Sequence, residues 1–466
     1  MISFFKHQFK LCRKKGGPGE ITEWVNITRS NPGDNPVVRL VLTGFDISFY
    51  NDDHPLHRVF VEPLVDGPGP FREYVPIKVK MGIRDHSNSW DDDFEGSVEL
   101  GIIVIDDDQI VTEEGKVSLS AQGEGPKIEK DYPQHHSPVY TTLALLKGFD
   151  MEFENDDHPV HLIMGKVDIQ NLPTEGTYYD IVQCTLGLRD LSGHWDDRYR
   201  GSIYYTLLRF PNGIITTDDG EITLSAVDKG PEIGEIDQLF NGKLRRENIF
   251  VGLKGFSLSF PYNEQKIHRL VSSLSWEDET IENKNTRIKI YYKGGIRDHS
   301  GNWDDAYMCE AEYTTIGIKS PQDTDIAIFL NKLNKKKEIA LQTHNGHYLC
   351  AEGGGGGQVL ADRTKIDIWE TFELIDLGNN NAAFKAHNGQ YLCAEGGGGK
   401  EIVANRDKLD IWETFKLIDL GNGNIAIRTH NGHYLCAEGG GGKEIVANRD
   451  KVDIWETFKL HQVRGE

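Results

Sequence analysis

Apolar and polar residues alternate with a period of two along most of the chain, a pattern that predicts β-strands. Residues 45–50 alternate in this way, residues 58–64 and 77–83 are strand-like, and residues 96–105 form a further strand before a turn of three aspartates. No long segment shows the spacing of an amphipathic helix. We therefore expect an all-β protein.

Three sequence landmarks recur about 105 residues apart in the first part of the chain. They are Gly-Phe at 44–45, 148–149 and 255–256, Gly-(Ile/Leu)-Arg-Asp at 82–85, 187–190 and 295–298, and Trp-Asp-Asp at 90–92, 195–197 and 303–305. Six or so short strands per repeat suit a small antiparallel sandwich. We predict three tandem antiparallel β-sandwich domains over residues 1–112, 113–222 and 223–333, similar in outline to the sandwich of H-type lectins.

A shorter repeat, present in three copies, fills the C-terminal region. Its cysteines, Cys350, Cys393 and Cys436, are spaced 43 residues apart, and so are Trp369, Trp412 and Trp455. Between residues 387–417 and 430–460 the second and third copies differ at only two positions, Gln390/His433 and Leu409/Val452. Such identity indicates a recent duplication or a shared task.

Each copy also alternates with a period of two. In the third copy, residues 425–429 and 434–437 flank Asn431-Gly432, a dipeptide typical of a tight hairpin turn, and residues 444–447 and 457–460 complete four strands. One copy is too small to bury a core, so the three must close on one another. Twelve short strands in three equal copies predict a β-trefoil over residues 334–466.

The C-terminal motifs resemble a known family. The string H-N-G-x-Y-L-C-A-E-G-G-G-G, followed by V-A-N-R-D and W-E-T-F, resembles the fascin-like (actin-crosslinking) branch of the β-trefoils over residues 337–466. The resemblance implies a binding role, either in bundling actin or in recognising glycans. It covers little more than a quarter of the chain, and the motif does not specify the ligand.

Composition excludes several classes of partner. The chain has 466 residues with 51 Lys+Arg against 73 Asp+Glu, a net charge of −22, which repels a phosphate backbone and predicts no nucleic-acid partner. No apolar run approaches the roughly 18 residues of a membrane-spanning helix. The apolar stretch at the N-terminus is too short for a secretory signal. We therefore expect a protein that is cytoplasmic or released without a classical signal peptide, with six reduced, buried cysteines.

Two histidine-containing segments are candidates for divalent metal binding. Residues 51–57 and 155–161 each place two histidines, His54 and His57 or His158 and His161, beside aspartates. The third repeat has Gln265-Lys266 where the others have His-Pro. We therefore favour a structural interpretation, a polar turn that leads into a strand.

The Arg-Asp-x-Ser-x-x-Trp-Asp-Asp segment of each repeat is a candidate Ca²⁺ site, because Ca²⁺ prefers several oxygen ligands. The candidate ligands are Asp85, Asp91, Asp92, Asp190, Asp196, Asp197, Asp298, Asp304 and Asp305. Arg84 and its counterparts offer these carboxylates a bidentate partner instead. A structural Arg-Asp-Trp corner is the favoured interpretation, and Ca²⁺ the alternative.

Polar residues at the hairpin ends form the candidate ligand surface of the C-terminal copies. They are His344, Asn345, Asp362, Arg363, His387, Asn388, Asn405, Arg406, His430, Asn431, Asn448 and Arg449. The favoured interpretation makes each Asn-Gly an ordinary turn and each Asn-Arg a solvated hairpin end. We expect the glycine runs to form tight loops open to a ligand, and the three tryptophans, taken to lie in strands, to pack in the core.

Function follows from repetition. No nucleophile and base arrangement appears, so we expect no enzymatic activity. Repeated weak sites suit multivalent binding, and we predict a lectin-like protein that recognises glycans or glycoconjugates. An actin-bundling protein is the alternative, although the acidic surface argues against binding to acidic filaments. A toxin or defence protein that docks through the trefoil is a second alternative.

Overall fold

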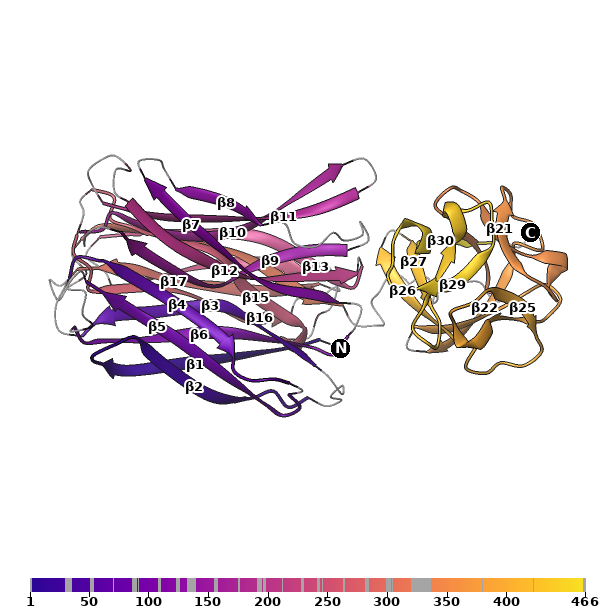
Figure 1. Cartoon of the computed structure of the whole chain (residues 1–466), viewed down its shortest axis with the longest axis horizontal. Coiled ribbons are helices and arrows are strands. Elements are labelled where there is room, and N and C mark those ends of the chain that lie inside the picture. The colour runs from indigo at the N-terminus through magenta and orange to yellow at the C-terminus, as the bar shows by residue number, and fades with distance from the viewer. Residues whose placement is uncertain are drawn as a thin grey trace. The chain divides into compact units, whose positions relative to one another are not determined.

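The computed structural model describes most of the chain. The described residues are 2–29, 36–50, 54–69, 71–85, 90, 92–107, 110–122, 126–131, 140–154, 158–174, 177–190, 195, 198–211, 213–227, 230–240, 244, 246–262, 265–280, 285–298, 303, 305–319, 337–378, 380–421 and 423–463. Their regular elements are β-strands and short 3₁₀ helices, which confirms the all-β prediction. The chain folds into two compact units, with strands β1–β18 in the first and β19–β30 in the second (Figure 1). No helix in the described ranges is long and apolar enough to cross a membrane.

The first unit contains six strands from each of three repeats. The first repeat supplies β1 (Ile2–Lys14), β2 (Gly19–Asn26), β3 (Val37–Phe49), β4 (Arg58–Val65), β5 (Tyr74–Arg84) and β6 (Phe94–Ile105). The second supplies β7 (Val111–Gln122), β8 (Lys127–Asp131), β9 (Tyr140–Phe153), β10 (Leu162–Thr174), β11 (Thr177–Arg189) and β12 (Arg198–Pro211). The third supplies β13 (Ile215–Ala226), β14 (Glu232–Phe240), η1 (Arg246–Asn248), β15 (Ile249–Ser259), β16 (Arg269–Thr280), β17 (Thr286–Arg297) and β18 (Tyr307–Ile318).

These strands do not form one sandwich per repeat. They form three six-stranded sheets, in the orders β1-β6-β3-β16-β17-β14, β2-β5-β4-β9-β12-β7 and β13-β18-β15-β10-β11-β8. Each sheet joins the first, sixth and third strands of one repeat to the fourth, fifth and second strands of another. The prediction of three separate sandwiches is therefore wrong, because the repeats exchange strands in a ring and share one hydrophobic core. Alternation shows which side of a strand is buried but not which strand lies beside it.

Three equivalent phenylalanines meet where the repeats join. Phe45, Phe149 and Phe256 are buried, and their ring centroids lie 4.9–5.1 Å apart. The glycine before each ring lets a neighbouring strand approach closely: a β-carbon at Gly44 would lie 2.7 Å from the Cα of Ser273. The Gly-Phe landmark therefore marks the contact between repeats.

The segments before the fourth strands also join the repeats. Backbone bridges pair His54 with Ile267, Leu56 with His158, and Val160 with Gln265. Each bridge has two N–H···O hydrogen bonds of 2.8–3.1 Å. The histidine segments thus lead into strands as predicted, and they also close a ring of contacts among the three repeats.

The second unit contains four strands from each of the three copies. The first copy supplies β19 (Glu338–Gln342), β20 (Tyr348–Ala351), η2 (Glu352–Gly354), β21 (Val359–Arg363) and β22 (Phe372–Gly378). The second supplies β23 (Asn381–Lys385), β24 (Tyr391–Ala394), η3 (Glu395–Gly397), β25 (Ile402–Arg406) and β26 (Phe415–Gly421). The third supplies β27 (Asn424–Arg428), β28 (Tyr434–Ala437), η4 (Glu438–Gly440), β29 (Ile445–Arg449), η5 (Ile454–Glu456) and β30 (Phe458–Gln462).

The first and fourth strands of each copy form a closed six-stranded barrel, β19-β22-β23-β26-β27-β30, in which β30 pairs with both β27 and β19. The second and third strands of each copy form the hairpins β20-β21, β24-β25 and β28-β29. Single backbone bridges link these hairpins to one another. A compact apolar core contributed equally by the three copies fills this unit.

The glycine runs hold the copies together. Gly396 to Gly399 all have positive φ, from 70° to 128°, which residues with a β-carbon rarely adopt. The run packs against the next copy: a β-carbon at Gly398 would lie 2.4 Å from the Oγ1 of Thr429, and the Gly399 N–H donates to the Ala447 carbonyl at 2.5 Å. A contact between copies therefore leaves no room for a side chain at Gly398, whereas the exposed Gly399 faces open space and is favoured only by its positive φ.

Candidate functional site

The predicted ligand surface divides into exposed histidines and residues with internal partners. His344, His387 and His430 are exposed. Asn345 and Asn431 instead donate side-chain hydrogen bonds of 2.9 Å to carbonyls in the glycine run of the preceding copy. These asparagines therefore tie the copies together.

The second copy departs from this arrangement at one asparagine. The Asn388 amide donates at 2.8 Å to Gln390, which occupies the position of a histidine in the other copies. Its backbone N–H still donates to the Gly354 carbonyl at 2.9 Å. The Gln390/His433 difference therefore alters the side-chain contacts of this turn but keeps the backbone contact.

The arginines of the predicted surface pair within their own copies. Arg363, Arg406 and Arg449 each donate to a glutamate at the start of the glycine run, Glu352, Glu395 and Glu438, at 2.5–2.7 Å. Their other amino groups contact the preceding side chains, Asp362, Asn405 and Asn448. Asn405, Asn448 and the three arginines thus have partners within their own copies, whereas the three histidines stand exposed in the Asn-Gly turns.

The tryptophans lie in turns, contrary to the prediction that they pack in the core from strands. Trp369, Trp412 and Trp455 are 37%, 39% and 39% exposed. Each stands between an aspartate and a buried glutamate: in the third copy the Asp453 N–H donates to Glu456 at 2.9 Å, and the Asp453 carboxylate accepts from the Ile454 N–H at 2.7 Å. This reciprocal capping fixes a tight turn and holds the intervening Ile-Trp pair outward.

An open hollow lies at the seam between the second and third copies. The second copy supplies Asn381, Ile411, Thr414 and Lys416, and the third copy supplies its Thr-His-Asn-Gly turn at 429–432. Ile411, an apolar residue of this lining, is 52% exposed. We call this the 2/3 hollow.

The seam between the third and first copies repeats the arrangement. Here the lining includes Asn424, Ile454, Thr457 and Lys459 from the third copy and residues 342–344 and 346 from the first. Each lining residue of this 3/1 hollow lies at a position equivalent to one in the 2/3 hollow, but Gln342 stands where the 2/3 hollow has Arg428. The sequence interpretation did not single out the Ile, Thr and Lys positions; the Asp-x-x-Glu spacing was the available signal for the turn that holds Ile454 outward.

The seam between the first and second copies carries different side chains. Glu373 replaces the lysine, Glu338 replaces the asparagine, and Ala386 replaces the threonine. A cation and two hydrogen-bonding groups are thus exchanged for two carboxylates and a methyl group. The chain therefore has two matched hollows and one altered seam.

Each Arg-Asp-Trp corner of the first unit contains an arginine stacked on a tryptophan. Arg84, Arg189 and Arg297 stack over Trp90, Trp195 and Trp303 at 5.1–5.5 Å. The glycines of the Gly-(Ile/Leu)-Arg-Asp landmark provide space for these rings, since a β-carbon at Gly82 would lie 2.7 Å from Trp90.

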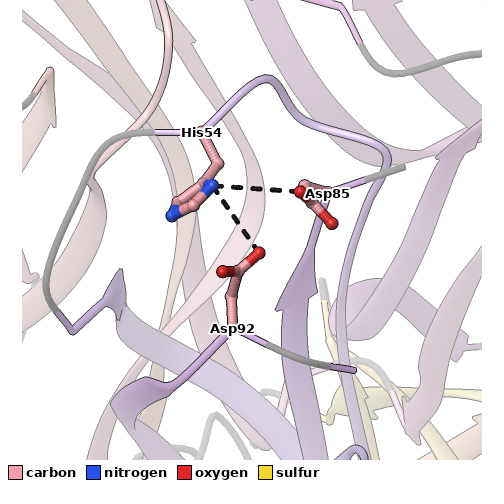
Figure 2. Close-up of side chains that lie close together, drawn as sticks. All are labelled: His54, Asp85 and Asp92. Atoms are coloured by element: carbon pink, nitrogen blue, oxygen red, sulfur yellow. Dashed lines mark ion pairs between the residues drawn. The ribbon is translucent and has the colours of Figure 1, made fainter. Parts of the chain in front are cut away.

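The predicted Ca²⁺ ligands are only partly described. Asp85, Asp92, Asp190, Asp298 and Asp305 lie in described segments, whereas Asp91, Asp196, Asp197 and Asp304 lie outside them. Among the described residues, one group of histidine and carboxylates converges: His54 Nδ1 lies 3.9 Å from an Asp85 oxygen and 3.6 Å from an Asp92 oxygen (Figure 2). The structure therefore brings together residues from two motifs that the sequence analysis treated separately.

The five buried cysteines are unsuited to nucleophilic chemistry. All six are free thiols; five are buried, and Cys12 is exposed, contrary to the prediction that all are buried. Burial is the main cause that raises the pKa of Cys184 and of Cys393 to about 12 each. Such thiols remain protonated at neutral pH, so they are poor nucleophiles and metal ligands.

Comparison with known proteins supplies a partial structural likeness. No family model and no curated protein matches the chain. Solved structures similar to part of it include the crystal structure of a designed 3-fold symmetric protein, ThreeFoil, at 19% identity and a TM-score of 0.26, over 27% of this chain and 99% of that chain. The function must therefore be inferred from the geometry of the chain itself.

Proposed function

We propose that the chain is a non-enzymatic, multivalent glycan-binding protein whose second unit is a β-trefoil that binds at the 2/3 and 3/1 hollows. The observation that carries this proposal is the occurrence of one hollow, with equivalent lining positions, at two seams. The closed six-stranded barrel with three linked hairpins supports the trefoil assignment.

The hollow has the mixture of groups that a sugar requires. A sugar ring presents hydroxyl groups around its edge and C–H groups on its faces. Ile411 offers an exposed apolar contact, and Thr414, Lys416 and the His430 turn surround it with hydrogen-bonding groups. Binding sites typically combine apolar contact with a few placed polar groups. An open, shallow hollow of this kind suits the exposed end of a glycan.

Two weak sites on one chain are useful only together. If each site binds a glycan with a millimolar dissociation constant, binding at the first hollow raises the effective concentration of a linked glycan at the second hollow. The apparent affinity for a multivalent glycoconjugate then exceeds that for a free sugar by about 10²–10⁴ where the spacing allows both contacts. Multivalent binding thereby gives a functional reason for the presence of two equivalent hollows.

The deciding experiment uses the full-length chain on a glycan array beside actin co-sedimentation. The test variant is Lys416→Glu with Lys459→Glu, which places at both hollows the charge that Glu373 gives the altered seam. The matched control is Lys408→Glu with Lys451→Glu, which makes the same charge change at exposed lysines that do not line either hollow.

We expect glycan binding by the wild type and the control, and its loss in the test variant. Co-sedimentation with actin and no glycan signal would favour the actin-bundling alternative. Glycan binding that the test variant retains would place the site elsewhere on the chain.

A further inference from the structure

The first repeat brings a histidine and two carboxylates together at one end of its sheets. His54 precedes β4, Asp85 directly follows β5, and Asp92 lies two residues before β6. Their donor atoms all lie within 4.8 Å of one another, and Figure 2 shows both carboxylates on the same side of the imidazole as its Nδ1 atom. The side chains are 21–29% exposed, so a small ion has access from solvent.

The two separations that involve the imidazole are close to those of ligands around a shared ion. The Nδ1–oxygen distances of 3.6 and 3.9 Å exceed the 2.7–3.2 Å of a good hydrogen bond. Bonds of 2.0–2.2 Å to a tetrahedral zinc ion place its ligand atoms about 3.3–3.6 Å apart. The His54–Asp92 pair, at 3.6 Å, already has this spacing. A side-chain adjustment of a few tenths of an ångström brings the His54–Asp85 pair, at 3.9 Å, to it.

We propose that His54, Asp85 and Asp92 bind a divalent transition-metal ion of the zinc type. One imidazole and two carboxylates suit such an ion, whereas Ca²⁺ takes oxygen ligands and gains nothing from the histidine. Two carboxylates balance the charge of a divalent cation when the imidazole is neutral. Water completes the coordination at the exposed side. The site belongs to the first unit, so it is independent of the glycan hollows proposed in the second.

The histidine is held in place by its surroundings. Its backbone makes both hydrogen bonds of the bridge to Ile267, at 2.9 and 3.0 Å. Its ring packs against Phe49 with centroids 4.6 Å apart. Fixing a ligand by packing and backbone contacts reduces the entropy lost when metal binds.

The third repeat contains a counterpart without the histidine. Gln265 occupies the position of His54, and its amide donates to Asp305, the counterpart of Asp92, at 3.4 Å. An amide donates a hydrogen bond to this carboxylate but is a poor ligand for zinc. The third repeat therefore shows that the same corner folds without a histidine, and His54→Gln reproduces it in the first repeat.

Zinc titration of the full-length, EDTA-treated chain by calorimetry tests the proposal. We expect the wild type to bind Zn²⁺, and one bound equivalent to be weakened at least about tenfold by His54→Gln and by Asp92→Asn, since even outer-shell changes cost 10–100-fold. His344→Gln, which removes an exposed histidine of the second unit, is the control for adventitious binding and should leave that equivalent unchanged.

Two results would overturn the proposal. One is an isotherm that is the same for wild type and for both site variants. The other is a loss of binding equal in His344→Gln and His54→Gln, which would indicate diffuse surface binding. Circular dichroism of each variant checks its fold, and Asp92→Asn decides the outcome if His54→Gln alters it.

Discussion

The Arg58 guanidinium donates two hydrogen bonds of 2.8 Å to the Asp150 carboxylate, and this pair joins β4 of the first repeat to β9 of the second. Arg269 and Asp46 form the same bidentate pair between the third and first repeats. At the remaining junction the equivalent residues are Leu162 and Ser257, so the arginine and the aspartate are absent together. The two charges behave as one structural feature.

This pairing predicts a compensating double substitution. Asp150→Ser leaves Arg58 without its bidentate partner and should lower the free energy of unfolding by about 1–3 kcal/mol. Adding Arg58→Leu reproduces the Leu162/Ser257 junction and should recover part of that loss, with a coupling energy of about 0.5–3 kcal/mol. Urea denaturation of the four chains of this cycle measures the coupling. Additive effects would show that the two charges act separately.

The phenylalanine cluster predicts that the first unit unfolds as one body. Phe149→Ala removes a buried ring that contacts both other repeats and should cost about 3–5 kcal/mol. All tryptophan signals of this unit should shift together to lower denaturant. Tyr262→Ala, at a side chain 77% exposed, is the control and should change stability by less than about 0.5 kcal/mol. Separate transitions, with only the second repeat destabilised, would instead indicate that the three repeats fold as independent domains.

Strand positions and repeat lengths were predictable from the sequence, because alternation and recurring landmarks are local properties. The partners of the strands were not. Nothing local in Val59 or Met151 shows that β4 pairs with β9 of another repeat. The Gly-Phe landmark contained the clue, since a glycine beside a buried ring indicates a close neighbour, but it does not identify that neighbour.

The candidate site was predictable only in part, for the same reason. The His-Asn-Gly turns were recognised from their composition, and two of them line the hollows. The three tryptophans were taken to lie in strands, next to the Glu-Thr-Phe segments. The buried Glu456 fixes the turn by accepting a hydrogen bond from the Asp453 N–H; its Asp-x-x-Glu spacing was visible in the sequence, but its burial was not. Sites formed between copies depend on such tertiary contacts.

The glycine run predicts a difference between neighbouring substitutions. Gly399→Ala places a β-carbon in open space, so its cost is the backbone strain of a positive φ, about 1–3 kcal/mol. Gly398→Ala incurs comparable strain and also places a β-carbon 2.4 Å from Thr429 Oγ1. Gly398→Ala should therefore lower the melting temperature of the full-length chain further. Equal melting temperatures would contradict a contact between copies at this position.

The buried Glu456 predicts a pH-dependent stability. Burial is the main cause that raises the pKa of Glu456 above its ordinary value of 4.5. The folded state then binds a proton more readily than the unfolded state, so this residue's contribution to stability falls as pH rises from about 4.5 through the raised pKa. Glu456→Gln, which retains an acceptor for the Asp453 N–H, removes this dependence.

Paired denaturation curves between pH 4 and 7 provide the measurement. We expect the stability of wild type relative to Glu456→Gln to increase as the pH is lowered. A constant difference across this range would mean that Glu456 does not titrate differently in the two states.

The altered seam predicts that a third binding site is obtainable by substitution. Glu373→Lys, Glu338→Asn and Ala386→Thr together give the seam between the first and second copies the side chains of the other two. Thr343 and Thr429 are both 5% exposed, as is Ala386, so the added hydroxyl and methyl groups have an established place in this fold. Titration calorimetry with a glycan found on the array should give two equivalents for the wild type and three for the triple variant. Glu373→Gln, which removes the carboxylate without adding the lysine, is the control and should remain at two. A triple variant that folds yet binds two equivalents would show that the lysine, asparagine and threonine do not form the binding surface.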